Sequence, residues 1–154
     1  FVYYAEDIDR CKILRIGENV DKKQKWRNSI PQDYLFYFPK KKVKDLWIAK
    51  SVKDACTLNF HFGLNSIATQ NEDGIHLLRN NYDRINPIAE RKIVNFGNDF
   101  QAWHESLLIT EYTGWEYFNV PQYMEKYGVN DVAALVEHFG VEPLKRLLEK
   151  KKYL

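Results

Sequence analysis

A regular alternation of strands and helices begins at the stretch Leu46-Trp47-Ile48-Ala49-Lys50-Ser51-Val52-Lys53-Asp54-Ala55. Its first four residues form a short apolar run, which predicts a buried strand. Ser51 is a favoured helix N-cap residue, and Val52 and Ala55 recur after it at helical spacing. Gly63 is expected to end this helix. The stretch therefore predicts a strand that leads directly into a helix.

The same order repeats toward the C-terminus. Further strands are predicted at residues 65–69, 92–96 and 115–120, and helices at residues 75–81, 100–112, 131–139 and 142–151. Strands that alternate with helices favour parallel pairing through crossover connections. We therefore expect an α/β domain over residues 46–154, with about four strands in a mainly parallel sheet flanked by helices. Trp47, Trp103 and Trp115 are expected in its core.

The first 45 residues have a different character. Aromatic and β-branched residues at positions 1–4, 12–16 and 34–38 predict three short strands. Two basic runs, at residues 22–27 and 40–44, accompany them, and solvated loops are the simplest interpretation of both. Residues 1–45 are expected to form a β-rich segment that precedes the α/β domain.

Composition narrows the classes of protein. The chain has 154 residues, of which 45% are hydrophobic and 29% charged, a balance typical of one globular domain. Its net charge of +2 is too small to indicate nucleic-acid or membrane binding by itself, so a basic function must be local. The sequence has no apolar run of about 18 residues and no signal-peptide pattern, which predicts a cytoplasmic protein without membrane partners. Because Met124 is the only methionine, Phe1 is not a translation start, and we expect a piece of a longer or processed protein.

Several common chemistries lack their motifs. The two cysteines, Cys11 and Cys56, are too few and too far apart for a disulfide framework or a zinc site. The four histidines show no spacing typical of metal ligands. Neither of the glycine-rich phosphate-binding motifs occurs, and neither Ser51 nor Ser66 lies in a nucleophile motif.

Residues 46–148 resemble the Toprim domain, the catalytic module shared by bacterial-type primases, topoisomerases and some nucleases. Four segments carry the resemblance: residues 46–55, 63–69, 92–99, and 129–132 followed by a helix, Gly140 and another helix. The family has Glu-Gly where this sequence has Lys50-Ser51. In this respect the sequence resembles primase-like proteins of bacteriophages and mobile elements. The resemblance implies a primase-like module that acts on nucleic acid in DNA replication.

The acidic motifs depart from that family. Its glutamate serves as a general acid or base, and its Asp-x-Asp carboxylates hold Mg²⁺. Here Lys50 stands at the glutamate position and Gly97 at the first aspartate position, while Asp99 is retained. Asp99 and Asp131 are the candidate Mg²⁺ ligands of a site that is weakened or abolished, and both are equally good N-caps of the helices that follow them. The catalytic residues, and primase-type nucleotidyl transfer itself, are therefore left open.

Basic residues are the candidate contacts to nucleic acid. The Lys50 ammonium could contact a phosphate, or it could pair with Asp54 or Asp99. Trp26 could stack on a base of a single strand. The predicted nucleic-acid-binding residues are Lys22, Lys23, Lys25, Trp26, Arg27, Lys41, Lys42, Lys50 and Lys53.

Three functions follow from these features. The first is a primase-like Toprim module, and the second is a catalytically degenerate Toprim that serves as a nucleic-acid-binding or assembly module. The expected partners are single-stranded DNA or RNA and other replication domains, such as a helicase or a zinc-binding domain. The third is an interaction protein without a nucleic-acid role. If the resemblance is correct, Lys50 and Asp99 lie at adjacent strand ends.

Overall fold

The structure is a computed structural model that describes residues 2–5, 10–14, 26–28, 30–31, 34–69 and 74–154. The chain divides into two compact units, Phe1–Tyr34 and Leu35–Leu154. The division precedes the predicted boundary at residue 45, because Leu35 and Phe36 are buried in the second unit and Phe36 forms an antiparallel bridge with Ala68.

The first unit contains a three-stranded antiparallel sheet in the order β1-β2-β3. Its strands are β1 (Val2–Ala5), β2 (Arg10–Leu14) and β3 (Trp26–Asn28). Strand β3 corrects the expectation of a loop at Trp26 and Arg27, since Trp26 pairs with Leu14 and Arg27 with Ile13, whereas residues 22–25 of that run lie outside the described residues. The neighbouring lysines lower the β propensity of this run, but pairing with β2 determines the structure. The N-terminal segment is thus β-rich, as predicted.

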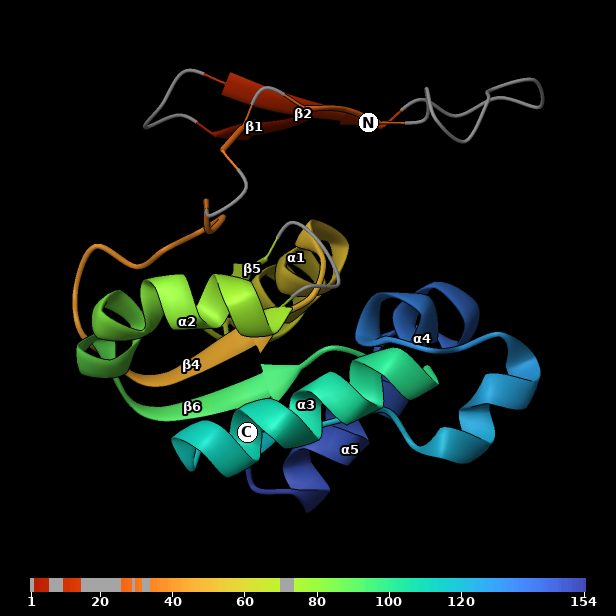
Figure 1. Ribbon diagram of the computed structural model, residues 1–154. Helices are drawn as coiled ribbons and strands as arrows, with labels where there is room; N and C mark the ends of the chain where they lie inside the picture. The colour runs from red at the N-terminus through yellow and green to blue at the C-terminus, as the bar shows by residue number, and fades with distance from the viewer. Residues whose placement is uncertain (1, 6–9, 15–25, 29, 32–33, 70–73) are drawn as a thin grey trace. The chain divides into compact units, whose positions relative to one another are not determined.

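The second unit is an α/β fold with a four-stranded, all-parallel sheet, which confirms the predicted fold class (Figure 1). The strand order is β5-β4-β6-β7. The elements in chain order are β4 (Val43–Ala49), α1 (Val52–Phe62), β5 (Ser66–Ala68), α2 (Gly74–Ile85), η3 (Asn86–Ile88), β6 (Ala89–Asn95), α3 (Phe100–Thr113), β7 (Glu116–Tyr117), η4 (Gln122–Tyr127), α4 (Val132–Phe139) and α5 (Val141–Lys150).

Helices cover both faces of this sheet. Leu46 and Ile48 of β4 belong to a core cluster with residues of α2 and α3. Trp47, between them, belongs to a second cluster with residues of α1, α4 and α5. A strand that is buried on both faces is apolar without interruption, which explains the run at residues 46–49. None of the helices within the described ranges is both long and apolar enough to cross a membrane.

Three local predictions differ from the structure. Residues 34–38 do not form a strand beyond the Phe36 bridge, because the chain turns at Tyr37, where φ is +59°, and Pro39 has no backbone N–H to donate. The strand predicted at residues 115–120 is reduced to the two residues of β7. The Trp103 side chain is 44% exposed instead of lying in the core, whereas Trp47 and Trp115 are buried.

Candidate functional site

Two side chains meet where the central strands end. Ala49, the last residue of β4, pairs with Asn95, the last residue of β6, and the Lys50 amide donates to the Asn95 carbonyl at 3.2 Å. The Lys50 Nζ atom lies 3.3 Å from Asp99 Oδ2. Lys50 and Asp99 therefore lie at adjacent strand ends, as the sequence predicts, at the edge where parallel α/β sheets place their working residues.

The Asp99 carboxylate has partners in the first turn of α3 and in Lys50. It is the N-cap of α3, since its Oδ1 atom accepts a hydrogen bond from the Ala102 amide at 2.9 Å. Burial acts to raise the pKa of Asp99, but the Ala102 and Gln101 backbone amides and the Lys50 ammonium outweigh it, so that the pKa lies below its ordinary value. Asp99 is therefore a charged acceptor that holds the Lys50 ammonium in place.

A second carboxylate, Asp54, is buried beneath this edge at 2% exposure. It lies in the first turn of α1, where its Oδ2 atom accepts a hydrogen bond from the Ser51 hydroxyl at 2.5 Å. Its Oδ1 atom accepts a hydrogen bond from the Ala133 amide at 3.1 Å. Asp54 thus links the first turns of α1 and α4. Asp54 is not among the site residues predicted from the sequence, although residues 46–55, one of the segments that resemble the Toprim domain, include it.

Asp131 is the third carboxylate of the edge and the N-cap of α4. Its Oδ1 atom accepts a hydrogen bond from the Ala134 amide at 2.7 Å. Burial, together with the negative charge of Asp131, raises the pKa of Asp54 to about 7. The N-termini of α1, α3 and α4 therefore converge at this edge, and Ser51, Asp99 and Asp131 cap them.

The turn between β6 and α3 packs tightly on the segment before α4. The backbone N–H of Asn98 donates a hydrogen bond to the backbone carbonyl of Asn130 at 2.7 Å. Gly97 has φ of +106°, and a Cβ atom there would lie 2.8 Å from the Asn130 carbonyl oxygen. A residue with a Cβ atom would have to displace the Asn130 backbone. The close packing of this edge therefore explains why position 97 carries no carboxylate.

The donor set does not fit a Mg²⁺ site of the family's type. Magnesium requires several oxygen ligands in near-octahedral geometry. The Lys50 ammonium already contacts Asp99, and both oxygens of Asp54 accept hydrogen bonds. Among the residues that the structure describes, no three histidine, cysteine, aspartate or glutamate side chains are grouped to hold a metal. Asp99 and Asp131 act as N-caps, and their role as Mg²⁺ ligands stays a prediction.

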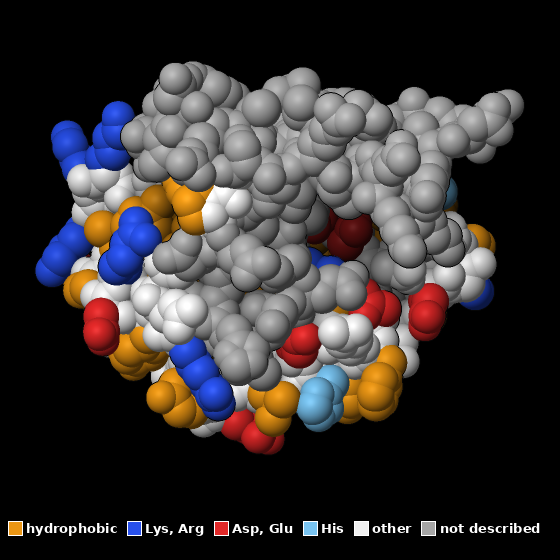
Figure 2. Space-filling model, turned by 45° about the horizontal axis from the view of Figure 1, so that its top comes forward, with side chains coloured by type: hydrophobic (Ala, Val, Ile, Leu, Met, Phe, Trp, Pro, Cys, Tyr) orange, Lys and Arg blue, Asp and Glu red, His pale blue; other side chains and the backbone are white. Residues whose placement is uncertain are grey.

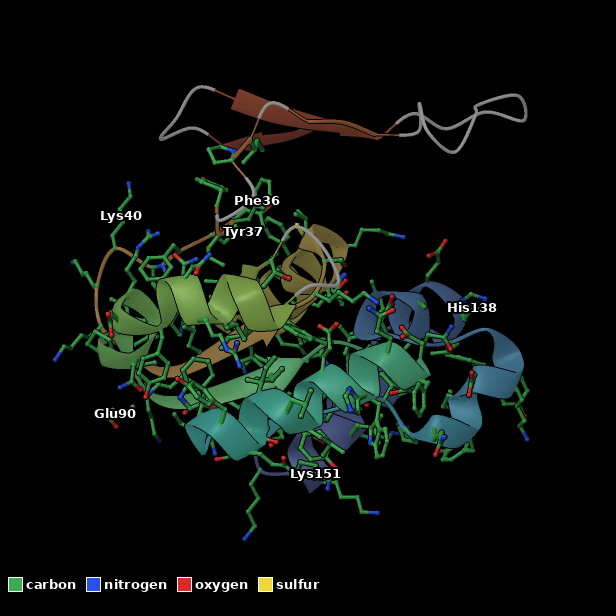
Figure 3. The ribbon with its side chains drawn as sticks, in the orientation of Figure 1. Phe36, Tyr37, Lys40, Glu90, His138 and Lys151 are labelled. Atoms are coloured by element: carbon green, nitrogen blue, oxygen red, sulfur yellow. The ribbon has the colours of Figure 1, made fainter. Side chains whose placement is uncertain are left out.

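The other predicted contacts are distributed over the chain. Lys53 is exposed on α1 and lies 3.6 Å from Glu137 of α4. Lys41 and Lys42 are exposed before the amino end of β4, opposite to Lys50. Figure 2 shows Lys and Arg side chains on the left, and Figure 3 labels Lys40 on that side, pointing away from the sheet.

The remaining predicted contacts belong to the first unit. Trp26 and Arg27 lie in β3, and their side chains are outside the described part of the chain. Lys22, Lys23 and Lys25 are also outside the described residues. Their role in binding stays a prediction.

Comparison with known proteins identifies a similar fold. No family model matches the sequence, and no curated protein matches it. The fold is similar to that of one chain in a solved structure. That structure contains the bacteriophage T7 lagging-strand DNA polymerase interacting with primase domains of two gp4 subunits bound to an RNA/DNA hybrid and dTTP. The TM-score is 0.52 at 14% sequence identity, over 78% of this chain and 65% of that chain. At this identity the similarity establishes the α/β fold, and this chain spans only part of the length of its neighbour.

Proposed function

We propose that this chain is a primase-like module of bacteriophage or mobile-element origin that binds single-stranded nucleic acid in DNA replication. The observation that carries the proposal is the Lys50–Asp99 pair at the carboxyl edge, between the N-termini of α1 and α3. The fold similarity to a structure that contains primase domains bound to an RNA/DNA hybrid supports it. Other replication domains, such as a helicase or a zinc-binding domain, are its expected partners.

The environment of Lys50 suits a phosphate contact. Its side chain is 18% exposed, whereas that of Asp99 is 44% exposed, so the ammonium is held at a fixed position and can be reached beside its carboxylate partner. Helix N-termini attract phosphate, and a lysine ammonium binds phosphate as a point charge. Because a phosphate must share this ammonium with Asp99, we expect each contact to be weak and strongly dependent on salt.

The proposed activity is binding, without a metal-dependent step. The Lys50 ammonium stands where the Toprim family places its glutamate, and Gly97 has no side chain to offer a metal. Lys50 and the N-termini of α1 and α3 position and neutralise a phosphate, and no step of the proposal requires Mg²⁺. This is the catalytically degenerate form of the primase-like hypothesis.

Salt-dependent binding of a labelled oligonucleotide tests the proposal. Fluorescence anisotropy with single-stranded DNA and RNA would compare the wild type, Lys50→Gln, and the control Lys145→Gln, which removes an exposed lysine of α5. We expect Lys50→Gln to weaken binding about 5- to 10-fold at low salt and to reduce the logarithmic salt slope by about 0.7. We expect Lys145→Gln to change the affinity by less than about twofold.

Two results would contradict the proposal. The first is binding that is absent, or that Lys50→Gln and Lys145→Gln weaken equally. The second is primer synthesis that requires Mg²⁺ and is lost in Asp99→Ala, because this would make the chain a metal-dependent enzyme. Affinities measured with Mg²⁺ and with EDTA at matched ionic strength should agree.

A further inference from the structure

A cavity of about 610 Å³ is lined by residues of α3, β7 and η4 and by Lys151, which follows α5. Asn98 and Phe100, the two sequence neighbours of Asp99, both line it. Lys151, labelled in Figure 3, also lines it from the end of α5. The cavity therefore adjoins the Lys50–Asp99 pair through the β6–α3 turn.

Exposed aromatic rings line this cavity. Phe100 is 80% exposed, Trp103 44% and Tyr117 45%. The rings of Phe100 and Trp103 are tilted against each other, with their centroids 6.3 Å apart. Phe100 is the first residue of α3 and has almost no role in the core, so packing does not explain a phenylalanine there. Aromatic faces that remain open to solvent are the surfaces on which nucleobases stack.

Carboxamide side chains supply the polar part of the lining. Asn98, Asn119 and Gln122 all border the cavity. Asn98 is only 7% exposed, and its amide nitrogen donates to the Pro121 carbonyl at 3.4 Å. In the described part of the chain, the Oδ1 atoms of Asn98 and Asn119 are buried without a hydrogen-bond partner. Unsatisfied buried acceptors are costly, so these side chains are suited to a ligand that brings N–H donors.

We propose that this cavity binds a nucleobase of the single strand whose phosphate Lys50 contacts. The ring lies against Phe100 and Trp103, and its polar edge faces the carboxamides of Asn98, Asn119 and Gln122. Carboxamides carry both donors and acceptors, as base edges do. Lys151, which is exposed, meets the backbone phosphate, and the exposed Glu125 disfavours a second anion in the cavity. This inference rests on the proposed function and adds a base-stacking site to it.

A matched pair of phenylalanines tests the stacking contact. Phe60 of α1 is 80% exposed, as Phe100 is, but does not line the cavity. We expect Phe100→Ala to weaken oligonucleotide binding about fivefold or more, Phe60→Ala to leave it unchanged, and Phe100→Trp to retain it. Because the ring carries no charge, Phe100→Ala should weaken binding at every salt concentration and leave the salt slope intact, in contrast to Lys50→Gln.

Amide NMR spectra separate this proposal from the proposed function. Titration with an oligonucleotide, and separately with adenosine monophosphate, should shift the side-chain amide signals of Asn98 and Gln122 and the indole signal of Trp103. Oligonucleotide binding with equal affinities for Phe100→Ala and Phe60→Ala, and without these shifts, would overturn the base site and leave the proposed function intact. Shifts with adenosine monophosphate without oligonucleotide binding would support the base site as a site for free nucleotides and refute the proposed function. The absence of both would refute both.

Discussion

The two ends of strand β4 both carry lysines, but they differ in almost every other respect. At the amino end, Lys40, Lys41 and Lys42 are exposed. At the carboxyl end, Lys50 is largely buried and lies 3.3 Å from Asp99, beside the N-termini of α1 and α3. A parallel sheet collects helix N-termini at its carboxyl edge only. The direction of the strand, more than the number of lysines, therefore determines where a fixed positive charge can meet an anion.

The largest effect expected at the carboxyl end is that of Gly97→Asp, which introduces the carboxylate that the resemblance to the Toprim domain would place there. A Cβ atom at this position would lie 2.8 Å from the Asn130 carbonyl oxygen, and φ is +106°. Strain and displacement of the backbone together should lower the free energy of unfolding by about 2–4 kcal/mol. Urea denaturation followed by circular dichroism measures this change.

Gly114→Asp is the control for this substitution. Gly114 also has a positive φ, +72°, but a Cβ atom there would meet nothing within 4 Å. The difference between the two variants isolates the close approach to Asn130. If Gly97→Asp were no more destabilising than Gly114→Asp, the tight packing of the carboxyl edge would be refuted.

Asp54→Asn should have the next largest effect, through the buried carboxylate at the same end. The pKa of Asp54 is raised from 3.8 to about 7 in the folded protein. Between these values the folded state holds a proton that the unfolded state has lost, so this group makes the protein less stable as the pH rises from about 4 to about 7. Asparagine carries no charge; its oxygen can accept the hydrogen bond from the Ala133 amide, and its NH₂ group can donate to the Ser51 hydroxyl, which donates in the wild type.

We therefore expect Asp54→Asn to be more stable than the wild type by about 1–3 kcal/mol at pH 8 and equally stable at pH 4. Urea denaturation at the two pH values measures this difference. Asp83→Asn, at an exposed position of α2, is the control for loss of a charge. A difference between Asp54→Asn and the wild type that does not grow with pH would contradict the raised pKa.

The smallest effect should come from the amino end. The double substitution Lys41→Gln with Lys42→Gln removes two exposed charges that are distant from the carboxyl edge. Because salt screens charges beyond about 8 Å at physiological ionic strength, we expect oligonucleotide affinity to fall by less than about twofold. The anisotropy assay used for Lys50→Gln measures it. A loss greater than that of Lys50→Gln would place the amino end in the interface and support the sequence-based prediction for Lys41 and Lys42.

Much of the fold could be predicted because its signals are local. The apolar run at residues 46–49 and the caps Ser51, Asp99 and Asp131 are all visible within a few residues of sequence. Strand β3 could not be predicted in this way, since pairing with β2 stabilises it despite the lysines around it. The run at residues 34–38 has strand-forming residues, but the turn at Tyr37 leaves one bridge.

The candidate site was predicted in part for the same reason. Lys50 and Asp99 each follow a predicted strand, and parallel pairing places them together. Apart from the resemblance over residues 46–55, nothing in the local sequence distinguishes Asp54 from an ordinary residue of a first helical turn. An aromatic residue at helical spacing is more often buried than part of a cavity, which predicts Trp103 in the core, but the structure leaves it exposed beside the cavity.

By itself, the sequence determined the order of strands and helices in the α/β domain, and this order brings Lys50 beside Asp99 at one edge of a parallel sheet. Tertiary structure alone decided the burial of Asp54 against Ala133, 79 residues away, the contact of Gly97 with Asn130, and the cavity beside Phe100. The physical reason is that strand order follows from local patterns of burial and capping. The pKa of a carboxylate, or the space for a base, depends on which distant segments pack against it.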